Sequence, residues 1–213
     1  MWEALSPEEH QRANDLQAGP PRQRFVASRS FLRLVLARYT GHAPAQLRFR
    51  LGLHGKPALS PEFGGDQLRF NLSHSNAMLL CAVSLNRAVG IDVEHVRPLP
   101  AIDRMAARIL SSNEQGAWQT LPDAHKLPVF FAIWTRKEAL VKGLGERLSA
   151  TFARVDVSLA PGQQAVMLPG QTGRQDWMIY PLPLSDGYVG AVAVEGGIEQ
   201  ALHWQSYRFE QEF

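Results

Sequence analysis

Two periods alternate along the chain, one of about 3.6 residues and one of two, and they predict helices and strands respectively. Residues 22–41 carry Phe25, Leu32, Leu36 and Tyr39 on one helical stripe, and Gly41 ends the pattern. Shorter helices are expected at residues 6–16, 101–110 and 112–121, and a longer one from Pro128 to about residue 143. Strands are expected at residues 47–53, 68–72, 78–85, 88–94, 152–159, 164–168, 176–182, 187–195 and 201–209.

Turn signals divide these segments into two halves. Asn86-Arg87 is short enough to form a hairpin turn between the strands that flank it. The two prolines of residues 95–100 interrupt the pattern and predict a linker between subdomains. On each side a long helix precedes several strands, which is a faint internal repeat. This grouping predicts an α+β architecture with subdomains at residues 1–97 and 98–213.

Composition and charge narrow the class of protein. The 213 residues are 45% hydrophobic and 20% charged, as in an ordinary globular protein. The net charge of +2 does not by itself indicate nucleic acid, and the arginines in the first quarter form either a local anion site or a solvated helix face. Cys81, the only cysteine, is expected to be a buried small hydrophobe. No secretory signal or apolar run of about 20 residues occurs, so we expect a cytoplasmic protein with no membrane partner.

Asp92 and Glu94 stand two residues apart at the end of an apolar strand. Because side chains at i and i+2 of a strand share a face, the two carboxylates point the same way. Carboxylates this close raise each other's pKa unless a cation lies between them, and a hard ion such as Mg²⁺ prefers oxygen ligands. The alternative is a strand end whose acids simply face water.

The stretch WTRKEALVKGLGERLS, residues 134–149, places Glu138 and Lys142 as i,i+4 neighbours on a helix. Apolar residues around them indicate that this helix is well buried. The pair can therefore line the wall of a cleft, where Glu138 supplies a third carboxylate to Asp92 and Glu94. The alternative is a surface ion pair worth roughly a few tenths of a kcal/mol.

The stretch FNLSHS is interpreted as a strand that ends in a tight bend at Ser73, His74 and Ser75. Hydroxyls, exposed amides and an imidazole in such a bend can hold phosphate oxygens, whereas a lone buried histidine is the alternative. The residue order offers no Asp-His-Ser triad, which argues against Ser73 as a nucleophile. The stretch HGKPAL offers a lysine beside a tight turn, but it lacks the spacing of a P-loop.

Together these stretches resemble the 4′-phosphopantetheinyl transferase superfamily, specifically its larger, pseudo-dimeric monomeric type (the surfactin-synthetase-activating type). GIDVE followed at this separation by W-T-x-K-E-A is a specific signal. RFVASRSFLR also looks like the early arginine-bearing helix of the family. The other matching elements occur in family order: GKP at 55–57, FNLSHS at 70–75, GIDVE at 90–94 and WTRKEALVKGLG at 134–145.

The resemblance implies two pseudo-twofold-related α+β subdomains with the active site in the cleft between them. It implies a monomer that transfers 4′-phosphopantetheine from coenzyme A to a serine of an apo acyl or peptidyl carrier protein, and releases adenosine 3′,5′-bisphosphate. The metal ligands would be Asp92, Glu94 and Glu138, holding Mg²⁺ or Mn²⁺. The catalytic residues would be Glu138 as base, with Lys142 and His74. The residues expected on coenzyme A are Arg22, Arg24, Arg29, Lys56, Pro57, Ser73, His74 and Lys142.

Two positions depart from the family pattern K-A-x-G-x-G-L: Gly143 replaces an alanine, and Arg147 replaces the last glycine. Arg136 or Arg147 is a candidate to meet an acidic carrier. Two other functions remain open, a Mg²⁺-dependent nucleotide or coenzyme A phosphohydrolase and a coenzyme A-binding module without catalysis. The sequence does not distinguish fatty-acid, polyketide and nonribosomal-peptide carriers.

Overall fold

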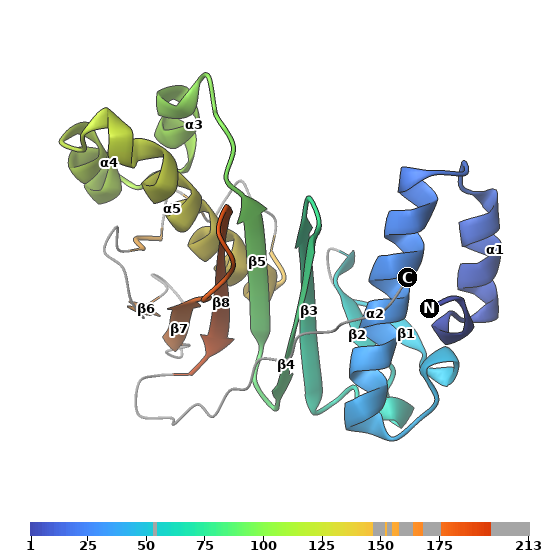
Figure 1. Ribbon diagram of the computed structural model, residues 1–213. Helices are drawn as coiled ribbons and strands as arrows, with labels where there is room; N and C mark the ends of the chain where they lie inside the picture. The colour runs from blue at the N-terminus through green and yellow to red at the C-terminus, as the bar shows by residue number, and fades with distance from the viewer. Residues whose placement is uncertain (53–54, 147–151, 153–154, 158–163, 168–175, 197–213) are drawn as a thin grey trace.

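The computed structural model describes residues 1–52, 55–146, 152, 155–157, 164–167 and 176–196. It mixes helices and strands, and the predicted α+β class is confirmed (Figure 1). The α-helices are α1 (Pro7–Asp15), α2 (Pro20–Thr40), α3 (Ile102–Ile109), α4 (Ser112–Gln119) and α5 (Asp123–Leu144). Short 3-10 turns are η1 (Trp2–Ala4), η2 (Pro44–Gln46) and η4 (Pro61–Phe63). The strands are β1 (Phe49–Leu51), β2 (Pro57–Leu59), β3 (Leu68–Ser75), β4 (Met78–Leu85), β5 (Val89–His95), β6 (Gln164–Met167), β7 (Asp176–Pro181) and β8 (Tyr188–Glu195).

All the paired strands run antiparallel. β1 pairs with β2, and β3 pairs with β4. A third sheet has the order β5-β8-β7-β6, in which Asp92 lies opposite Ala191 and Glu94 lies opposite Val189. β5 therefore takes its backbone partner from the second half of the chain, although it lies in the first.

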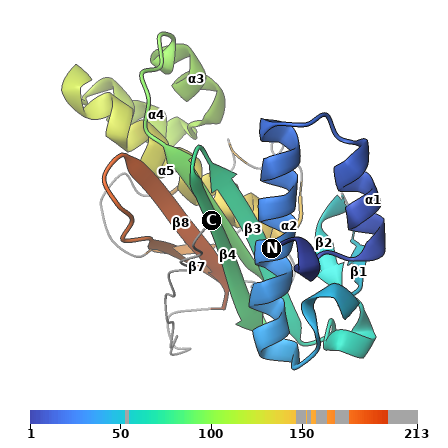
Figure 2. The ribbon, with the colours of Figure 1, turned by 45° about the vertical axis from the view of Figure 1, so that its right-hand side comes forward.

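The predicted hairpin turn at Asn86-Arg87 is wrong. The hairpin joins β3 to β4 at Asn76 and Ala77, where Asn76 has a φ of 51°. Asn86, with a φ of 58°, instead turns the chain away from that pair, and its amide donates to the carbonyl of Gln67. β5 lies beside β3 in both views (Figures 1 and 2), but side chains of β3 rather than its backbone take up the amides of β5.

The two long helices cover different sheets. α5 packs on β5 and β8, whereas α2 packs near β4 on the other side of the strands (Figure 1). Leu32 and Leu36 of α2 are buried, as the helical stripe predicts, but Tyr39 at the end of the stripe is 55% exposed. Ile133 and Leu140 of α5 lie in a separate core. Burial raises the pKa of the Cys81 thiol to about 12, which agrees with a non-nucleophilic cysteine. In the described ranges no helix is long and apolar enough to span a bilayer.

Helix ends follow local sequence signals. Ser6 caps α1, and Gly41 ends α2 in the left-handed conformation. Ser111 and Glu114, whose spacing in the sequence is that of a capping box, form one at the start of α4. Each of these helix ends depends on residues that are neighbours in sequence.

The predicted boundaries of α5 and β1 are wrong. α5 begins at Asp123 and contains Pro128, so the proline does not mark the helix start. A proline removes one backbone donor, and the burial of most of α5 offsets that loss. The strand predicted at 47–53 shrinks to β1, and Leu51 is 76% exposed.

The later strands are partly described. β6, β7 and β8 confirm three of the five predicted strands in this region. Residues 155–157 have no strand conformation, which contradicts that part of the strand expected at 152–159. The expected strand at 201–209 lies outside the described residues.

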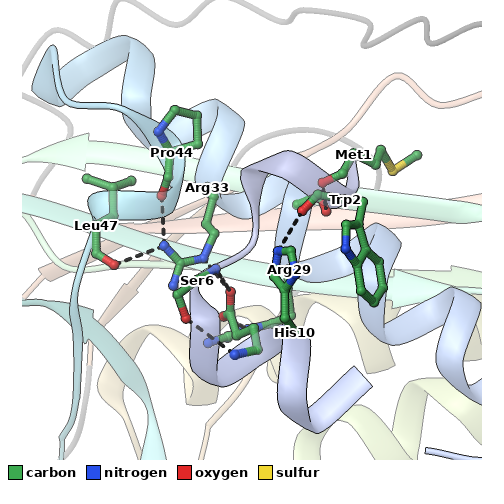
Figure 3. Close-up of polar contacts among 10 residues, drawn as sticks. Met1, Trp2, Ser6, His10, Arg29, Arg33, Pro44 and Leu47 are labelled. Atoms are coloured by element: carbon green, nitrogen blue, oxygen red, sulfur yellow. Dashed lines mark hydrogen bonds and ion pairs between the residues drawn. The ribbon is translucent and has the colours of Figure 1, made fainter. Parts of the chain in front are cut away.

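A polar cluster fixes α1 against α2. The carboxylate of Glu9 accepts hydrogen bonds from Arg33 and from Nε of Arg29, the latter at 2.6 Å. Arg33 is buried and also donates to the carbonyls of Pro44 at 2.7 Å and Leu47 at 2.9 Å (Figure 3). Some of the early arginines therefore hold the amino-terminal helices together.

Candidate active site

Strand β5 approaches helix α5 closely because Gly90 has no side chain. A Cβ there would lie 2.0 Å from the carbonyl oxygen of Ala139 and 2.3 Å from the amide nitrogen of Gly143. Asp92 and Glu94 follow on the same face of the strand, since alternate residues share a face. The glycine thus brings both acids to the side of α5.

Asp92 is 4% exposed, and its two carboxylate oxygens have different surroundings. Oδ1 accepts a hydrogen bond from Ser73 Oγ at 2.9 Å and forms an ion pair with Lys142 Nζ at 2.6 Å. Oδ2 is buried and has no hydrogen-bond partner among the described residues. Burial raises the pKa of Asp92. The negative charge of Glu94 also raises this pKa, whereas Lys142 lowers it.

Glu138 of α5 faces the same group of charges and is 6% exposed. Its pKa is raised to about 7, mainly by burial and also by the charges of Asp92 and Glu94, against the opposing effect of Lys142. The structure therefore brings together the three acids that the sequence singled out, together with Lys142. Their mutual repulsion is the electrostatic situation that a cation relieves.

These acids do not surround a common point in the present conformation. Within the described residues, no three histidine, cysteine or acidic side chains are arranged so that they could hold a metal ion. Lys142 Nζ contacts the oxygen of Asp92 that faces Ser73. The chemistry of the donors nevertheless fits a hard dication, because Oδ2 of Asp92 is a buried oxygen that receives no donor from the described residues, and burial disfavours a negative charge on Glu138.

The predicted bend at Ser73, His74 and Ser75 is wrong, because β3 continues through Ser75 and pairs with β4 throughout. Alternation turns Ser73 toward β5, where it is buried, and leaves His74 exposed on the other face. The hydroxyl of Ser73 contacts Asp92, Lys142 and the amide of Val93. Contact of Ser73 with a phosphate stays a prediction, and it would have to displace one of these partners.

Lys56 also has internal partners. Its ammonium donates to the carbonyls of Val89 at 3.2 Å, Lys142 at 2.5 Å and Gly143 at 3.1 Å, which accounts for all three of its donors. Burial and the charge of Arg69 lower the pKa of Lys56 to about 8. Lys56 thus joins the carboxyl end of α5 to the start of β5, and its contact with coenzyme A is untested, as is that of Pro57 beside it.

The three early arginines lie in the α1–α2 region. Arg22 donates to Asn14 at 2.8 Å, and Arg29 forms an ion pair with Glu9. Arg24 is exposed. None of the contacts in the described part of the chain connects them to the three acids. Their proposed contacts with coenzyme A therefore remain predictions.

Sequence reasoning missed several polar residues that shape the site. Asn71, which sequence reasoning missed, and Ser75, which it placed in a bend, both contact β5 from β3. Their signal was a polar residue at every second position of an otherwise apolar strand. Lys137, next to Glu138, forms a buried ion pair with Glu114. Arg136 is 4% exposed, so its candidacy for an exposed carrier contact is wrong.

Known proteins resemble this chain along most of its length. The sequence profile of the 4′-phosphopantetheinyl transferase superfamily matches residues 88–193, which include Asp92, Glu94, Glu138 and Lys142. The 4′-phosphopantetheinyl transferase HetI of Nostoc sp. is 38% identical over 200 residues, covering 94% of this chain and 82% of HetI. A putative 4′-phosphopantetheinyl transferase of Synechocystis sp. is 31% identical, covering 89% of this chain and 78% of that protein. The 4′-phosphopantetheinyl transferase Sfp of Bacillus subtilis is 26% identical, covering 78% of this chain and 71% of Sfp.

Proposed function

The chain belongs to the 4′-phosphopantetheinyl transferase superfamily, and from this premise we propose that it transfers 4′-phosphopantetheine from coenzyme A to a serine hydroxyl of an apo acyl or peptidyl carrier protein. The second product is adenosine 3′,5′-bisphosphate. One observation carries the proposal: Asp92 and Glu138 are buried side by side with Glu94 and Lys142, inside the region that the family profile matches.

Asp92, Glu94 and Glu138 would hold a Mg²⁺ ion, with Mn²⁺ as the other candidate. When bound, the ion would withdraw negative charge from the pyrophosphate of coenzyme A and so make the bisphosphate a better leaving group. Oδ2 of Asp92, which has no hydrogen-bond partner among the described residues, and the raised pKa of Glu138 support this assignment. Lys142, which is partly exposed, adds a positive charge at the same place.

Glu138 is the proposed base. An ionised carboxylate beside the attacking hydroxyl group can accept its proton, either directly or through a water molecule. In the proposed step the carrier serine gives its proton to Glu138 while its oxygen forms a bond to the phosphorus that bears pantetheine. The bond from that phosphorus to the bridging oxygen breaks, and the electron pair leaves with the adenosine bisphosphate.

The residues proposed to bind coenzyme A differ in how readily they can do so. Arg24 and His74 are exposed and can contact phosphate as they stand. Lys142 lies at the acids and is about one-third exposed. The others, Arg22, Arg29, Lys56, Pro57 and Ser73, lie in strands or hold internal partners, so we rank them as weaker contacts.

We further propose that the active site lies between two subdomains divided near residue 97, in a monomer. β5 supports this location of the site. Its backbone pairs with β8 of the second half, and its other edge contacts side chains of β3 in the first half. Lys142 spans the same boundary by contacting Ser73. Both halves therefore contribute to the site.

The direct test is mass spectrometry of several apo carrier proteins after incubation with this protein, coenzyme A and Mg²⁺. A gain of one phosphopantetheine on a carrier supports the proposal, and Asp92→Asn should abolish the gain without unfolding the protein. Cleavage of coenzyme A when no carrier is present would indicate a phosphohydrolase. Calorimetric binding of coenzyme A with transfer to no carrier would indicate a binding module.

A further inference from the structure

One edge of β5 is held by side chains instead of by a neighbouring strand. In the described part of the chain, β5 is the edge strand of its sheet, with β8 on one side. The amides of Ile91, Val93 and His95 point to the other side, where buried amides need acceptors. The acceptors are Asn71 Oδ1 at 2.9 Å, Ser73 Oγ at 3.3 Å and Ser75 Oγ at 3.0 Å, in that order.

The two serines make a second contact that the asparagine does not. Ser73 Oγ donates to Oδ1 of Asp92 at 2.9 Å, and Ser75 Oγ donates to Oε2 of Glu94 at 3.0 Å. Each hydroxyl thus accepts from one amide of β5 and donates to the acid that precedes that amide. At the third position the residue before the amide is Gly90, where there is no acid to hold.

The direction of the Ser73 hydroxyl follows from counting its neighbours. Val93 N and Lys142 Nζ both donate to Ser73 Oγ, and a hydroxyl oxygen has two lone pairs. The proton of Ser73 must therefore point to Oδ1 of Asp92. Oδ1 then receives two donors from the protein, and only Oδ2 is left without one among the described residues.

We propose that Ser73 and Ser75 are positioning residues for the carboxylates of Asp92 and Glu94. Each serine binds one carboxylate oxygen, so that the other oxygen of that carboxylate faces the cation. This inference rests on the proposed function, because it assumes that the two acids hold a cation. Partners that orient metal ligands typically change metal affinity by about 10- to 100-fold when removed. The FNLSHS stretch would then act through its two serines, which orient the carboxylates that bind the cation.

The experiment measures the binding of Mn²⁺ to the full chain by electron paramagnetic resonance, without coenzyme A or carrier. Ser75→Ala and Ser73→Ala should each weaken Mn²⁺ binding by about 10- to 100-fold. Ser75→Thr keeps a hydroxyl at the same place and should restore affinity close to that of the wild type. The matched control is Ser84→Ala, since Ser84 is a half-buried serine on β4 that donates to the carbonyl of Arg87 and contacts neither acid.

The outcomes separate this inference from the function on which it rests. If the wild type does not bind Mn²⁺, the proposed metal site fails and the inference fails with it. If the wild type and Ser75→Ala bind equally well, only the positioning role is overturned, even if thermal stability falls. Should Ser75→Ala not fold, Ser75→Cys keeps a similar volume with a weak donor and is expected to lose affinity in the same way.

Discussion

Two lysines of helix α5, Lys137 and Lys142, each form an ion pair with a buried acid, and the two pairs differ in how completely they are satisfied. Lys137 is 1% exposed and donates to Glu114 at 2.6 Å and to the carbonyls of Ile109 and Phe152. All three of its donors are used. Lys142 is partly exposed and has two partners among the described residues, Asp92 and Ser73.

The acids differ in the same way. Glu114 accepts at both oxygens, because Oε2 also receives the amide of Ser111 at 2.8 Å and Oε1 receives the amide of Val157 at 2.7 Å. Asp92 accepts only at Oδ1, and Oδ2 is buried without a donor in the described residues.

A buried network in which every donor and acceptor has a partner, such as that of Lys137 and Glu114, stabilises the fold. A network with a buried oxygen that receives no hydrogen bond, such as that of Asp92, has an oxygen that can bind an ion. The sequence motif WTRKEALVK thus combines a structural lysine, Lys137, with one placed at the site, Lys142. The predictions below test that distinction.

The largest expected effect is on folding, in Lys137→Met. Removing one member of a buried ion pair leaves Glu114 charged and uncompensated, which typically costs about 3–5 kcal/mol. We expect the free energy of unfolding in urea to fall by that amount. The control is Lys126→Met on the same helix, whose partners Asp103 and Asp123 are mostly exposed, so little change is expected. Equal stability of the two variants would erase the contrast between the two lysines.

Lys142→Met should show the opposite balance between stability and activity. Loss of a preorganised charge at the reacting phosphates is expected to slow transfer by about 10²- to 10³-fold. Stability should fall less than in Lys137→Met, because Asp92 can take up a proton when its partner is removed. Steady-state transfer kinetics and urea unfolding would be measured on the same preparation, with Lys142→Arg retaining part of the activity. Near-normal transfer by Lys142→Met would show that Lys142, like Lys137, has a structural role only.

The third prediction concerns pH. In the fold the pKa of Glu138 is raised from 4.5 to about 7, so its contribution to stability is fully present below about 4.5 and is lost as the pH rises through about 7. A cation offsets that loss by binding the ionised form, and metal affinity should fall by up to about tenfold for each pH unit below 7.

The measurement is the increase in melting temperature that Mg²⁺ produces at pH 5.5 and at pH 8. We expect a clear increase at pH 8 and a small one at pH 5.5. Glu138→Gln should respond weakly at both values. An equal response of the wild type at both pH values would show that Glu138 does not bind the ion.

The smallest effects are expected at two helical glycines. A Cβ on Gly143 would lie 2.5 Å from the ring of Trp177, which is itself buried, so Gly143→Ala should cost about 1–3 kcal/mol through overpacking. Gly116 of α4 has nothing within 4 Å of the same position, so Gly116→Ala should stabilise by about 0.5–1 kcal/mol. Thermal unfolding of the two variants decides the signs. A Gly143→Ala variant as stable as the wild type would show that α5 has room to move against its sheet.

Local features of this fold could be predicted from the sequence. The capping boxes and the glycine end of α2 depend on residues a few positions apart, and they occur where the pattern predicts. The partner of β5 could not be predicted, because β8 lies about one hundred residues further along and the Asn86-Arg87 turn was the nearer explanation.

In the site, too, local features could be predicted from the sequence and long-range contacts could not. The spacing of Asp92 and Glu94, and of Glu138 and Lys142, placed each pair on one face of its element. The internal partners of Lys56 and Ser73 could not be foreseen, since those contacts join β2 and β3 to α5 across long stretches of chain.

The seam between β3 and β5 limits how the molecule can move. The hydroxyls of Ser73 and Ser75 bind both the amides of β5 and the carboxylates of the two acids on that strand. Any motion that separated β3 from β5 would therefore have to break the contacts to the acids together with those to the backbone of β5. A hinge motion there would thus also release these acids.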